Sequence, residues 1–589
     1  MTKPPSSTLR YRLAGAWSNG APLTRRQLLR ASAIGAAGLA LPACSPSSSP
    51  TAARTLDAGP PPRPPRPPAP PALPVDLASC RPIAEVTAPA SGFLADDFTR
   101  PHEVLWKLDE YFTNNGPPPP AREHTDVVVV GGGMSGLGVA WLLRDKKPIV
   151  LEQAPRFGGN SKGERWQGIE YSMGAAYFAD TDPDEELRTK FYTPLGLDKA
   201  WRVVGDDPVV TGEHLQFQFW EGKTDKKRAR DFHKAKAWFV DVLKHHYPDI
   251  PWAPGGQLDE AALAELDKRS LREELESKLG ASLHPHVATL CDHYAWSTFL
   301  CGWEEISAAA FLCSFVAEFD GVVVLPGGNA FAAERLLEQT AAAVPPTNLR
   351  PSTLVIRVAQ AADGVDVTAL GPDGAPYTIH AKTCVMACPK FVAKKILVDL
   401  PPAQRSAIDR IKYRSYVVAN VLVNAPLEVD AYDVYLLGDQ PPGADLAAES
   451  TKQGVTDVVL GHWAKHGDPK RSVLTLYRPY PYDGARAALF DPASFTRVKG
   501  ELEQQLPGIL SLFKLEPEQV QELRVARWGH PINVSTKGQI ADGTWAAARA
   551  PIGGRIFFCE QDNWPAPCIE TAFLCALETE AAVRKVVTG

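Results

Sequence analysis

The sequence lacks the spacing patterns that are typical of metal sites and of disulfide scaffolds. Its 10 cysteines include no C-x-x-C pair, and no grouping of histidine with cysteine has the spacing of metal ligands. We therefore predict no metal site. The formal net charge is only −6 over 589 residues, and without a basic surface we expect no nucleic-acid partner. After residue 44, no run reaches the ~18 apolar residues that a membrane-spanning helix needs.

The first 44 residues have the pattern of an export signal. Arg25 and Arg26 stand before a short apolar segment, residues 31–43, which is too short to span a bilayer stably. The paired arginines resemble the bacterial twin-arginine signal, and the closing L-P-A-C resembles a lipobox, whose cysteine here is Cys44. We predict Tat-like export to the periplasm or cell envelope with a lipid anchor at Cys44. An ordinary cleavable signal with a chance cysteine is the alternative.

Proline, alanine and serine dominate much of the stretch that follows, residues 45–95. A segment of this composition buries no core, so we predict a disordered, semi-rigid linker. Behind a lipidated cysteine, such a spacer would hold a folded domain off a membrane surface. The chain as a whole is 44% hydrophobic, which is enough to fill real cores after the linker.

A glycine-rich turn predicts a nucleotide site. Residues 127–130 fit a buried parallel strand, and residues 137–144 fit the helix that follows it. Between them, Gly131, Gly133 and Gly136 stand in G-x-G-x-x-G order. The first glycine permits the tight turn, the second lets backbone approach a pyrophosphate, and the third lets the helix pack on the strand. The helix N-terminus then offers N–H groups to the phosphates.

An acidic residue closes the next predicted strand, residues 148–151. Glu152 lies 21 residues after Gly131, where an acid binds ribose hydroxyls, and an acid there argues against a 2′-phosphate. These residues alone leave NAD and FAD open. A glycine-rich turn without any ligand is the structural alternative.

The residues after this acid favour FAD. Glu152, Arg156, Gly158 and Gly159 form E-x-x-x-R-x-G-G, and a Gly-Ala turn follows at residues 174–175. In these motifs the sequence resembles the flavin amine oxidase superfamily, and in organisation the spermidine dehydrogenase-like group. The resemblance implies that the glycine pair passes under the pyrophosphate and ribityl chain of FAD. NAD dehydrogenases have no such second glycine pair.

The resemblance recurs in two later blocks, residues 325–397 and 553–586. It implies that the backbone of Val355 meets the adenine and that Glu560 contacts the ribityl and pyrophosphate region. It also implies that a helix beginning near Ile569 points its N-terminus at the flavin ring. The cofactor-binding candidates are Gly131, Gly133, Ser135, Gly136, Glu152, Arg156, Gly158, Gly159, Val355, Glu560 and Ile569.

The same resemblance implies an α/β fold with two domains. A Rossmann-like FAD-binding domain of the glutathione reductase type would be assembled from discontinuous segments, and an α+β domain would bind the substrate. The FAD-binding segments are residues 124–180, 320–395 and 545–589, and the substrate-binding segments are residues 181–319 and 396–544.

Oxidation by a flavin needs a substrate carbon over the flavin N5, a proton route and a dry pocket. Trp528 and His530 resemble the segment that precedes the last FAD block, and Trp564 precedes the last helix. We take these three as catalytic candidates, with packing or a structural histidine as the alternative for each. Glu304 and Glu305 form either an acidic pocket wall for a cationic amine or the favoured first turn of a helix.

We therefore predict an exported FAD-dependent oxidoreductase that takes a hydride from an amine C–N bond and leaves an imine for water to hydrolyse. Oxygen or a respiratory carrier would accept the electrons. Two alternatives stay open: a desaturase-like flavoenzyme acting on C–C bonds, and a flavin-binding protein without turnover.

Overall fold

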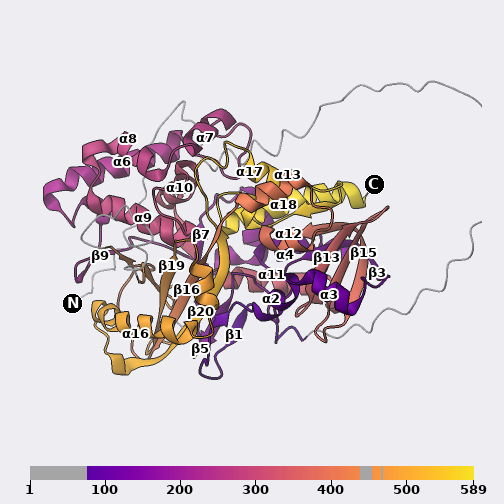
Figure 1. Cartoon of the computed structure of the whole chain (residues 1–589). Helices are drawn as coiled ribbons and strands as arrows, with labels where there is room; N and C mark the ends of the chain where they lie inside the picture. Colours follow the sequence, from indigo (N-terminus) through magenta and orange to yellow (C-terminus); the bar gives the residue numbers. More distant parts are fainter. Residues whose placement is uncertain (1–75, 438–453, 466–467, 589) are drawn as a thin grey trace, which may run out of the picture.

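The computed structural model describes residues 76–437, 454–465 and 468–588 (Figure 1). The predicted signal with Arg25, Arg26 and Cys44, and the linker up to residue 75, lie outside the described residues. Within the described part of the chain, no helix is both long and apolar enough to cross a bilayer.

The linker prediction is wrong for residues 76–95. Strand β1 (Ile83–Glu85) pairs in parallel with β5 (Gly163–Trp166), and β2 (Leu94–Ala95) pairs in parallel with β20 (Val520–Asn533). Cys80 and Ile83 are buried in this segment. A few apolar anchors and free backbone groups at two sheet edges are enough to order a stretch whose average composition predicts disorder.

The FAD-binding part is built on a seven-stranded sheet. Its strand order is β12-β4-β3-β15-β14-β13, and β21 pairs with β15. Cys384 of β15 lies between Val128 of β3 and Ile556 of β21. The sheet therefore joins distant segments of the chain, and the predicted fold class is confirmed. The strand bounds are β3 Ala121–Val130, β4 Ile149–Leu151, β12 Leu349–Arg350, β13 Leu354–Gln360, β14 Val365–Leu370, β15 Pro376–Met386 and β21 Ile556–Phe558.

The four valines that end β3 are buried because both faces of this sheet are covered. Val127 and Val129 face a core shared with helices α4 (Met134–Leu142), α11 (Asn329–Ala343) and α18 (Ile569–Val587). Val128 and Val130 face a second core with α2 (Thr99–Leu105), α12 (Lys390–Ile396), α13 (Pro402–Arg410) and α17 (Thr544–Ala548). Successive side chains point to opposite faces, so a strand between two layers reads as a continuous apolar run.

The second part is built on an eight-stranded sheet of order β10-β9-β17-β18-β19-β16-β20-β2. Its long central strands are β16 (Tyr413–Val423) and β19 (Ser472–Tyr480), which with β20 form antiparallel pairs. Figure 1 shows helices α6, α8 and α9 gathered on the side away from the FAD-binding sheet. The bounds of the remaining elements used below are α6 Ala229–His245, α8 Leu271–Leu279, α9 Pro285–Phe299, α10 Ala308–Phe315, α16 Ser494–Leu512, β7 Tyr177–Ala179, η7 Val316–Phe319 and η10 Gln561–Asn563.

Candidate functional site

Two neighbouring cavities bring the predicted site residues together. The nucleotide cavity contains the glycine turn and Glu152 in its wall. The inner cavity lies next to Gly174 and the start of α18. Asn160, Trp528 and Pro531 line both cavities, so the two lie side by side at these residues.

The glycine turn has the geometry that a pyrophosphate needs. A Cβ on Gly136 would lie 2.0 Å from the carbonyl oxygen of Gly131, so only glycine lets α4 pack against the turn. Gly131 itself has φ +114°, in the region that favours glycine. In front of Gly133, by contrast, the nearest atom to a Cβ would be the Gly159 Cα at 3.6 Å. Gly133 and Gly159 therefore lie against each other, and both line the nucleotide cavity at the N-terminus of α4, beside buried Ser135.

Glu152 is held in a fixed position at the end of β4. Its Oε2 accepts a hydrogen bond from the Gly132 N–H at 2.7 Å, and its Oε1 accepts one from the Ala154 N–H at 2.8 Å. Burial raises the pKa of this carboxyl, and the Lys162 ammonium opposes the rise. Val355 lines the same cavity from the start of β13. Together with the glycine turn, an acid and a strand backbone at these places fit the adenosine diphosphate half of FAD.

Two of the other predicted cofactor residues, Arg156 and Gly158, do not line either cavity and instead hydrogen-bond to backbone that supports the wall. The Arg156 guanidinium donates to the carbonyl oxygens of Arg81 at 3.0 Å, of Pro82, and of Gly163 at 2.8 Å, and it lines neither cavity. The prediction of a direct cofactor contact by Arg156 is therefore corrected, because backbone carbonyls occupy its donors. Gly158 also stands behind the wall, where its N–H donates to the Gly132 carbonyl oxygen at 2.9 Å.

A buried ionic cluster that the sequence did not reveal supports the last FAD block. The Lys390 Nζ lies 2.5 Å from Glu560 Oε1 and 3.6 Å from Asp562 Oδ1. The Asp562 carboxylate also accepts from the Tyr413 hydroxyl and from the Lys390 N–H at 3.1 Å. Burial lowers the pKa of Lys390, and the Asp562 charge opposes that shift. Glu560 lines neither cavity, so it positions this block and is not a cavity-wall contact.

The three catalytic candidates separate in space. Trp528 lines both cavities and donates from Nε1 to the Met173 carbonyl oxygen at 2.6 Å. His530 lines only the nucleotide cavity, where its ring stacks on Phe391 at 4.2 Å. Burial lowers the pKa of His530 to about 3, and the Arg486 and His102 charges add to this effect. A buried imidazole with so low a pKa, in the wall of the nucleotide cavity alone, favours the structural alternative for His530.

Trp564 does not stand in the cavity wall either. The Arg549 guanidinium lies 3.6 Å from the centre of its ring, and Trp564 lines neither cavity. Its prediction as a wall of the flavin ring is corrected, because the indole packs beneath an arginine instead. By contrast, Ile569 lines the inner cavity at the first residue of α18. No side chain caps this helix start, which leaves its N–H groups and positive dipole end available.

The carboxylates of Glu304 and Glu305 pair with basic side chains away from the cavities. Glu305 lies 2.7 Å from Arg414 Nη1 and 3.1 Å from Lys412 Nζ. Glu304 pairs with Arg272. Neither glutamate lines the inner cavity, and neither lies in the first turn of a helix, since α10 begins only at Ala308. Both alternatives for this pair are therefore wrong, and the two glutamates form ion pairs instead.

The inner cavity has a different acid in its wall. Glu318, in η7, lies beside Tyr294, and burial raises the pKa of its carboxyl to about 8. The Asp207 charge adds to the rise, and a hydrogen bond from Tyr294 opposes it. Among the described residues that line this cavity, none is lysine or arginine. A second acid, Glu570, lines the same cavity, and its Oε1 accepts a hydrogen bond from the Ala179 N–H at 2.6 Å. The wall therefore presents two acids without a basic side chain beside them.

Two further carboxyls lie close to this wall. The Ser297 hydroxyl donates to Asp457 Oδ1 at 3.1 Å and lies 2.8 Å from the Tyr416 hydroxyl. Burial raises the pKa of Asp457 to about 7 and that of Asp207 to about 7. A side of the cavity with several protonatable carboxyls favours a cationic guest, because a positive charge lowers their pKa values and compensates their negative charge.

Together, the Rossmann-like sheet, the glycine cradle and the two neighbouring cavities fit an FAD-dependent oxidoreductase. Residues 134–574 match the family of flavin-containing amine oxidoreductases, and the chain belongs to this family. Its cofactor is FAD, which when bound supplies the acceptor for two electrons and a proton taken from the substrate.

Known proteins resemble the chain over most of its length. It is 23% identical over 515 residues to Oxidoreductase PigB of Serratia sp. (strain ATCC 39006), with 77% of this chain and 74% of that protein covered. A putrescine oxidase redesigned in its cofactor binding has a TM-score of 0.59 at 17% identity, over 78% of this chain and 99% of its own. Cyclohexylamine oxidase from Brevibacterium oxydans IH-35A has a TM-score of 0.58 at 17% identity, over 79% and 100%. These structures share the fold.

Proposed function

We propose that the protein oxidises the C–N bond of a cationic amine whose ammonium group binds beside Glu318. The observation that carries this proposal is the acid in the wall of the inner cavity, with no lysine or arginine among the described lining residues. The names of the two solved amine oxidases with the same fold support the choice of an amine. The spermidine dehydrogenase-like character, meaning a polyamine substrate, is part of the same proposal.

In this reaction the nitrogen that reacts first gives up its ammonium proton to a carboxylate of the wall or to water. A hydride then leaves the carbon next to this nitrogen, the amine becomes an iminium, and water hydrolyses the C=N bond. Glu318 and Tyr294 hold the charged end of the substrate, while the apolar wall from Ala175 to Phe178 excludes water from the carbon that reacts. The uncapped start of α18 at Ile569 stabilises negative charge that develops beside it.

Anaerobic mixing of the purified yellow protein with candidate substrates tests the proposal. We expect diamines, polyamines or monoamines to bleach the flavin absorbance, and Glu318→Gln to need much higher amine concentrations. Bleaching only by apolar compounds without nitrogen would favour the desaturase-like alternative. A flavin that no compound reduces, although dithionite does, would indicate a binding protein without turnover.

The electron acceptor is a separate part of the proposal: oxygen or a respiratory carrier. An oxygen electrode and a quinone or cytochrome analogue, offered to the same amine-reduced protein, distinguish the two. Rapid oxygen consumption supports an oxidase, and turnover only with the carrier supports a dehydrogenase.

We further propose Tat-like export and a lipid anchor, on the sequence pattern of residues 24–44. Cell fractionation of the full chain should find it in the periplasm or cell envelope. Replacing Arg25 and Arg26 by lysine should retain it in the cytoplasm. Cys44→Ser should release it from the membrane fraction if Cys44 is lipidated, and unchanged membrane association would exclude the anchor.

A further inference from the structure

The segment in front of the family match lies along the nucleotide cavity. We call residues 76–106 the N-terminal strap; the match to the family begins only at residue 134. The strap enters the core at Cys80, whose carbonyl oxygen accepts from the Phe157 N–H at 3.0 Å. It then adds β1 and β2 to two different sheets and ends with helix α2. A segment outside the shared family region thus reaches the cofactor site.

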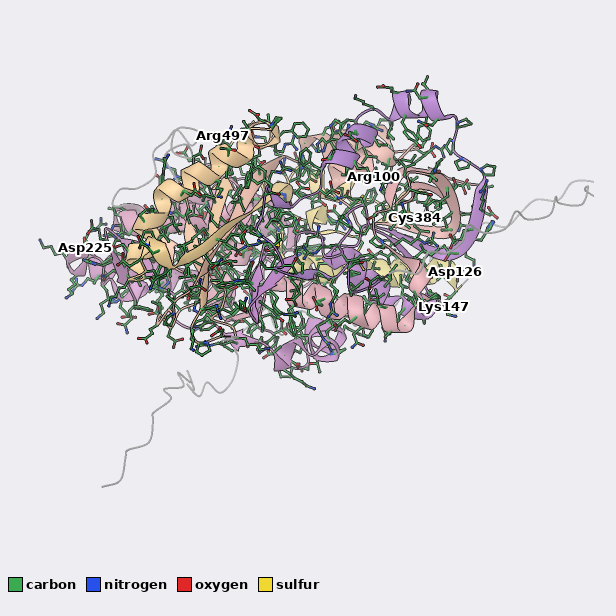
Figure 2. All side chains as sticks on the ribbon, turned by 90° about the horizontal axis from the view of Figure 1, so that it is seen from below. Arg100, Asp126, Lys147, Asp225, Cys384 and Arg497 are labelled. Atoms are coloured by element: carbon green, nitrogen blue, oxygen red, sulfur yellow. The ribbon has the colours of Figure 1, made fainter. Side chains whose placement is uncertain are left out.

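Arg100 fixes the end of the strap to the FAD-binding sheet. Its guanidinium donates to the carbonyl oxygens of Ser352 at 2.8 Å, Leu370 at 3.2 Å and Gly371 at 2.5 Å. Figure 2 shows Arg100 at the same end of the molecule as Cys384 of β15, far from Asp225. Three bonds to backbone carbonyls from one charged group form a strong local anchor.

The middle of the strap is fixed next to Trp528. Asp96 Oδ2 accepts from the Gly529 N–H at 3.1 Å, and the Asp97 carbonyl oxygen accepts from Gln153 Nε2 at 3.3 Å. Gln153 directly follows the ribose-binding candidate Glu152. The strap therefore contacts Gly529, directly after Trp528, whose side chain lines both cavities.

The strap supplies part of the cavity wall with apolar and aromatic side chains. His102 stacks on Trp106 at 4.3 Å, and the Arg527 guanidinium lies 4.0 Å from the centre of the Phe98 ring. These contacts hold the rings in place. The strap residues that line the nucleotide cavity are Ala95, Asp96, Asp97, Phe98, Pro101, His102, Leu105 and Trp106.

We propose that residues 95–106 of the strap are part of the FAD site and cover its adenosine half. Glu152 and Val355 lie in the wall of the cavity that the strap closes. Bound FAD then leaves only after α2 detaches from the sheet. The main effect of the strap is on the rate of FAD release, since the covering contacts exist in full only in the closed state.

Release of FAD from the holoprotein tests the proposal, with the fluorescence of free flavin as the readout. Arg100→Ala should release FAD at least about tenfold faster, because it removes the three anchoring bonds, and Arg100→Lys should fall between this variant and the parent. Arg122→Ala is the matched control: it removes an exposed arginine on β3 and should leave the release rate unchanged.

A second variant, Phe98→Ala with Trp106→Ala, removes wall side chains without touching Arg100. It should also release FAD faster. Folding of each variant is checked by circular dichroism, and hydrogen exchange of residues 95–106 reports whether the strap has loosened. Faster exchange of the strap with FAD release at the parent rate in both variants overturns the proposal.

Protection of the strap gives an independent readout. Trypsin should cut the FAD-free protein after Lys107, close to the end of α2, and FAD should slow this cut several-fold. A cut at the same rate with and without FAD contradicts the proposal, whatever the activity of the enzyme.

Discussion

Lys390 and Glu560 form a buried salt bridge that joins two segments of the FAD-binding sheet 170 residues apart along the chain. Lys390 begins α12, directly after the turn that follows β15, and Glu560 follows β21. The Lys390 side chain is fully buried, and its Nζ also donates to Asn563 Oδ1 at 2.5 Å. One ammonium thus compensates the carboxylates of Glu560 and Asp562 in a place that water does not reach.

Replacing this lysine should therefore destabilise the protein strongly. Lys390→Met leaves two buried carboxylates without their cation, which costs about 3–5 kcal/mol. Urea unfolding of the FAD-free protein measures the change. Lys394→Met, on the same helix but at a partly exposed ion pair with Asp409, should cost less than about 1 kcal/mol. Equal losses for the two variants would contradict a special role for the buried lysine.

The glycine cradle predicts a selective loss of FAD. Gly133→Val should abolish FAD retention, because its side chain would occupy the part of the nucleotide cavity beside Gly133 and Gly159 that fits the pyrophosphate. The ratio of flavin to protein absorbance measures the effect. Gly138→Ala is the control: a Cβ there meets ordinary contacts at 3.5 Å, on the far side of the same helix from the turn. Yellow holoprotein from the Gly133 variant would refute this placement of the cofactor.

Glu318 predicts that amine binding depends on pH. Its pKa of about 8 means that the carboxylate, which binds an ammonium group, becomes dominant only above that pH in the free protein. We expect the dissociation constant of a cationic amine to fall as pH rises from 6 to 8. Glu318→Gln should bind the amine about 10- to 100-fold more weakly and with a flatter profile between these pH values.

Glu503→Gln, at an exposed carboxylate of α16, serves as the control and should keep the parent profile. The perturbation of the flavin spectrum by an amine, recorded anaerobically, gives the dissociation constants. If the dissociation constant of Glu318→Gln depends on pH as that of the parent does, the ammonium group binds elsewhere.

The same shift predicts how stability responds to pH. The folded pKa of about 8 lies above the unfolded value of ~4.3 for a glutamate, so the folded state holds a proton that the unfolded state has lost. The contribution of Glu318 to stability is therefore full below ~4.3 and is lost as pH rises to about 8. Between pH 5 and 8, the melting temperature of the parent should fall more steeply than that of Glu318→Gln, as measured in thermal scans.

His530 predicts the opposite direction. Its folded pKa of about 3 lies below the unfolded value of ~6.5, so between these pH values only the unfolded state binds a proton at this imidazole. The free energy of unfolding therefore falls as the pH falls from ~6.5 toward about 3. His530→Phe should therefore lose less stability than the parent between pH 6.5 and 4. The pH profile of turnover between 5 and 8 should stay unchanged, since the imidazole is neutral throughout. If the pH dependence of turnover seen in the parent disappears in His530→Phe, His530 carries a proton in the reaction after all.

Local signals in the sequence were enough to predict the glycine turn and Glu152 as parts of one nucleotide site, and both line the same cavity. Each is encoded within a few residues, by backbone requirements that only certain side chains satisfy. Val355, the helix start at Ile569 and the fold class were predicted from the resemblance to the flavin amine oxidases. Val355 lines the nucleotide cavity, and α18 begins at Ile569.

The residues that the sequence did not reveal depend on partners far along the chain. Lys390 stands in K-F-V-A-K-K, where its sequence context is that of one of three surface lysines. It is buried because Glu560 and Asp562, some 170 residues later in the chain, pack against it and compensate its charge. Glu318 has no local motif, and its shifted pKa arises from burial next to elements from other segments. Arg156 was predicted as a cofactor-binding residue and Trp564 as a catalytic one. Backbone carbonyl groups accept the hydrogen bonds of Arg156, and the Arg549 guanidinium covers the Trp564 ring.

Strand β21 and helix α18 have a consequence for the order in which the protein matures. They are synthesised after the other described elements, yet β21 pairs with β15 and α18 packs on α4, which was made more than 400 residues earlier. The FAD site therefore stays incomplete until both have left the ribosome. A nascent chain stalled before residue 556 carries the glycine turn but not the completed site, so cofactor loading has to wait for α18.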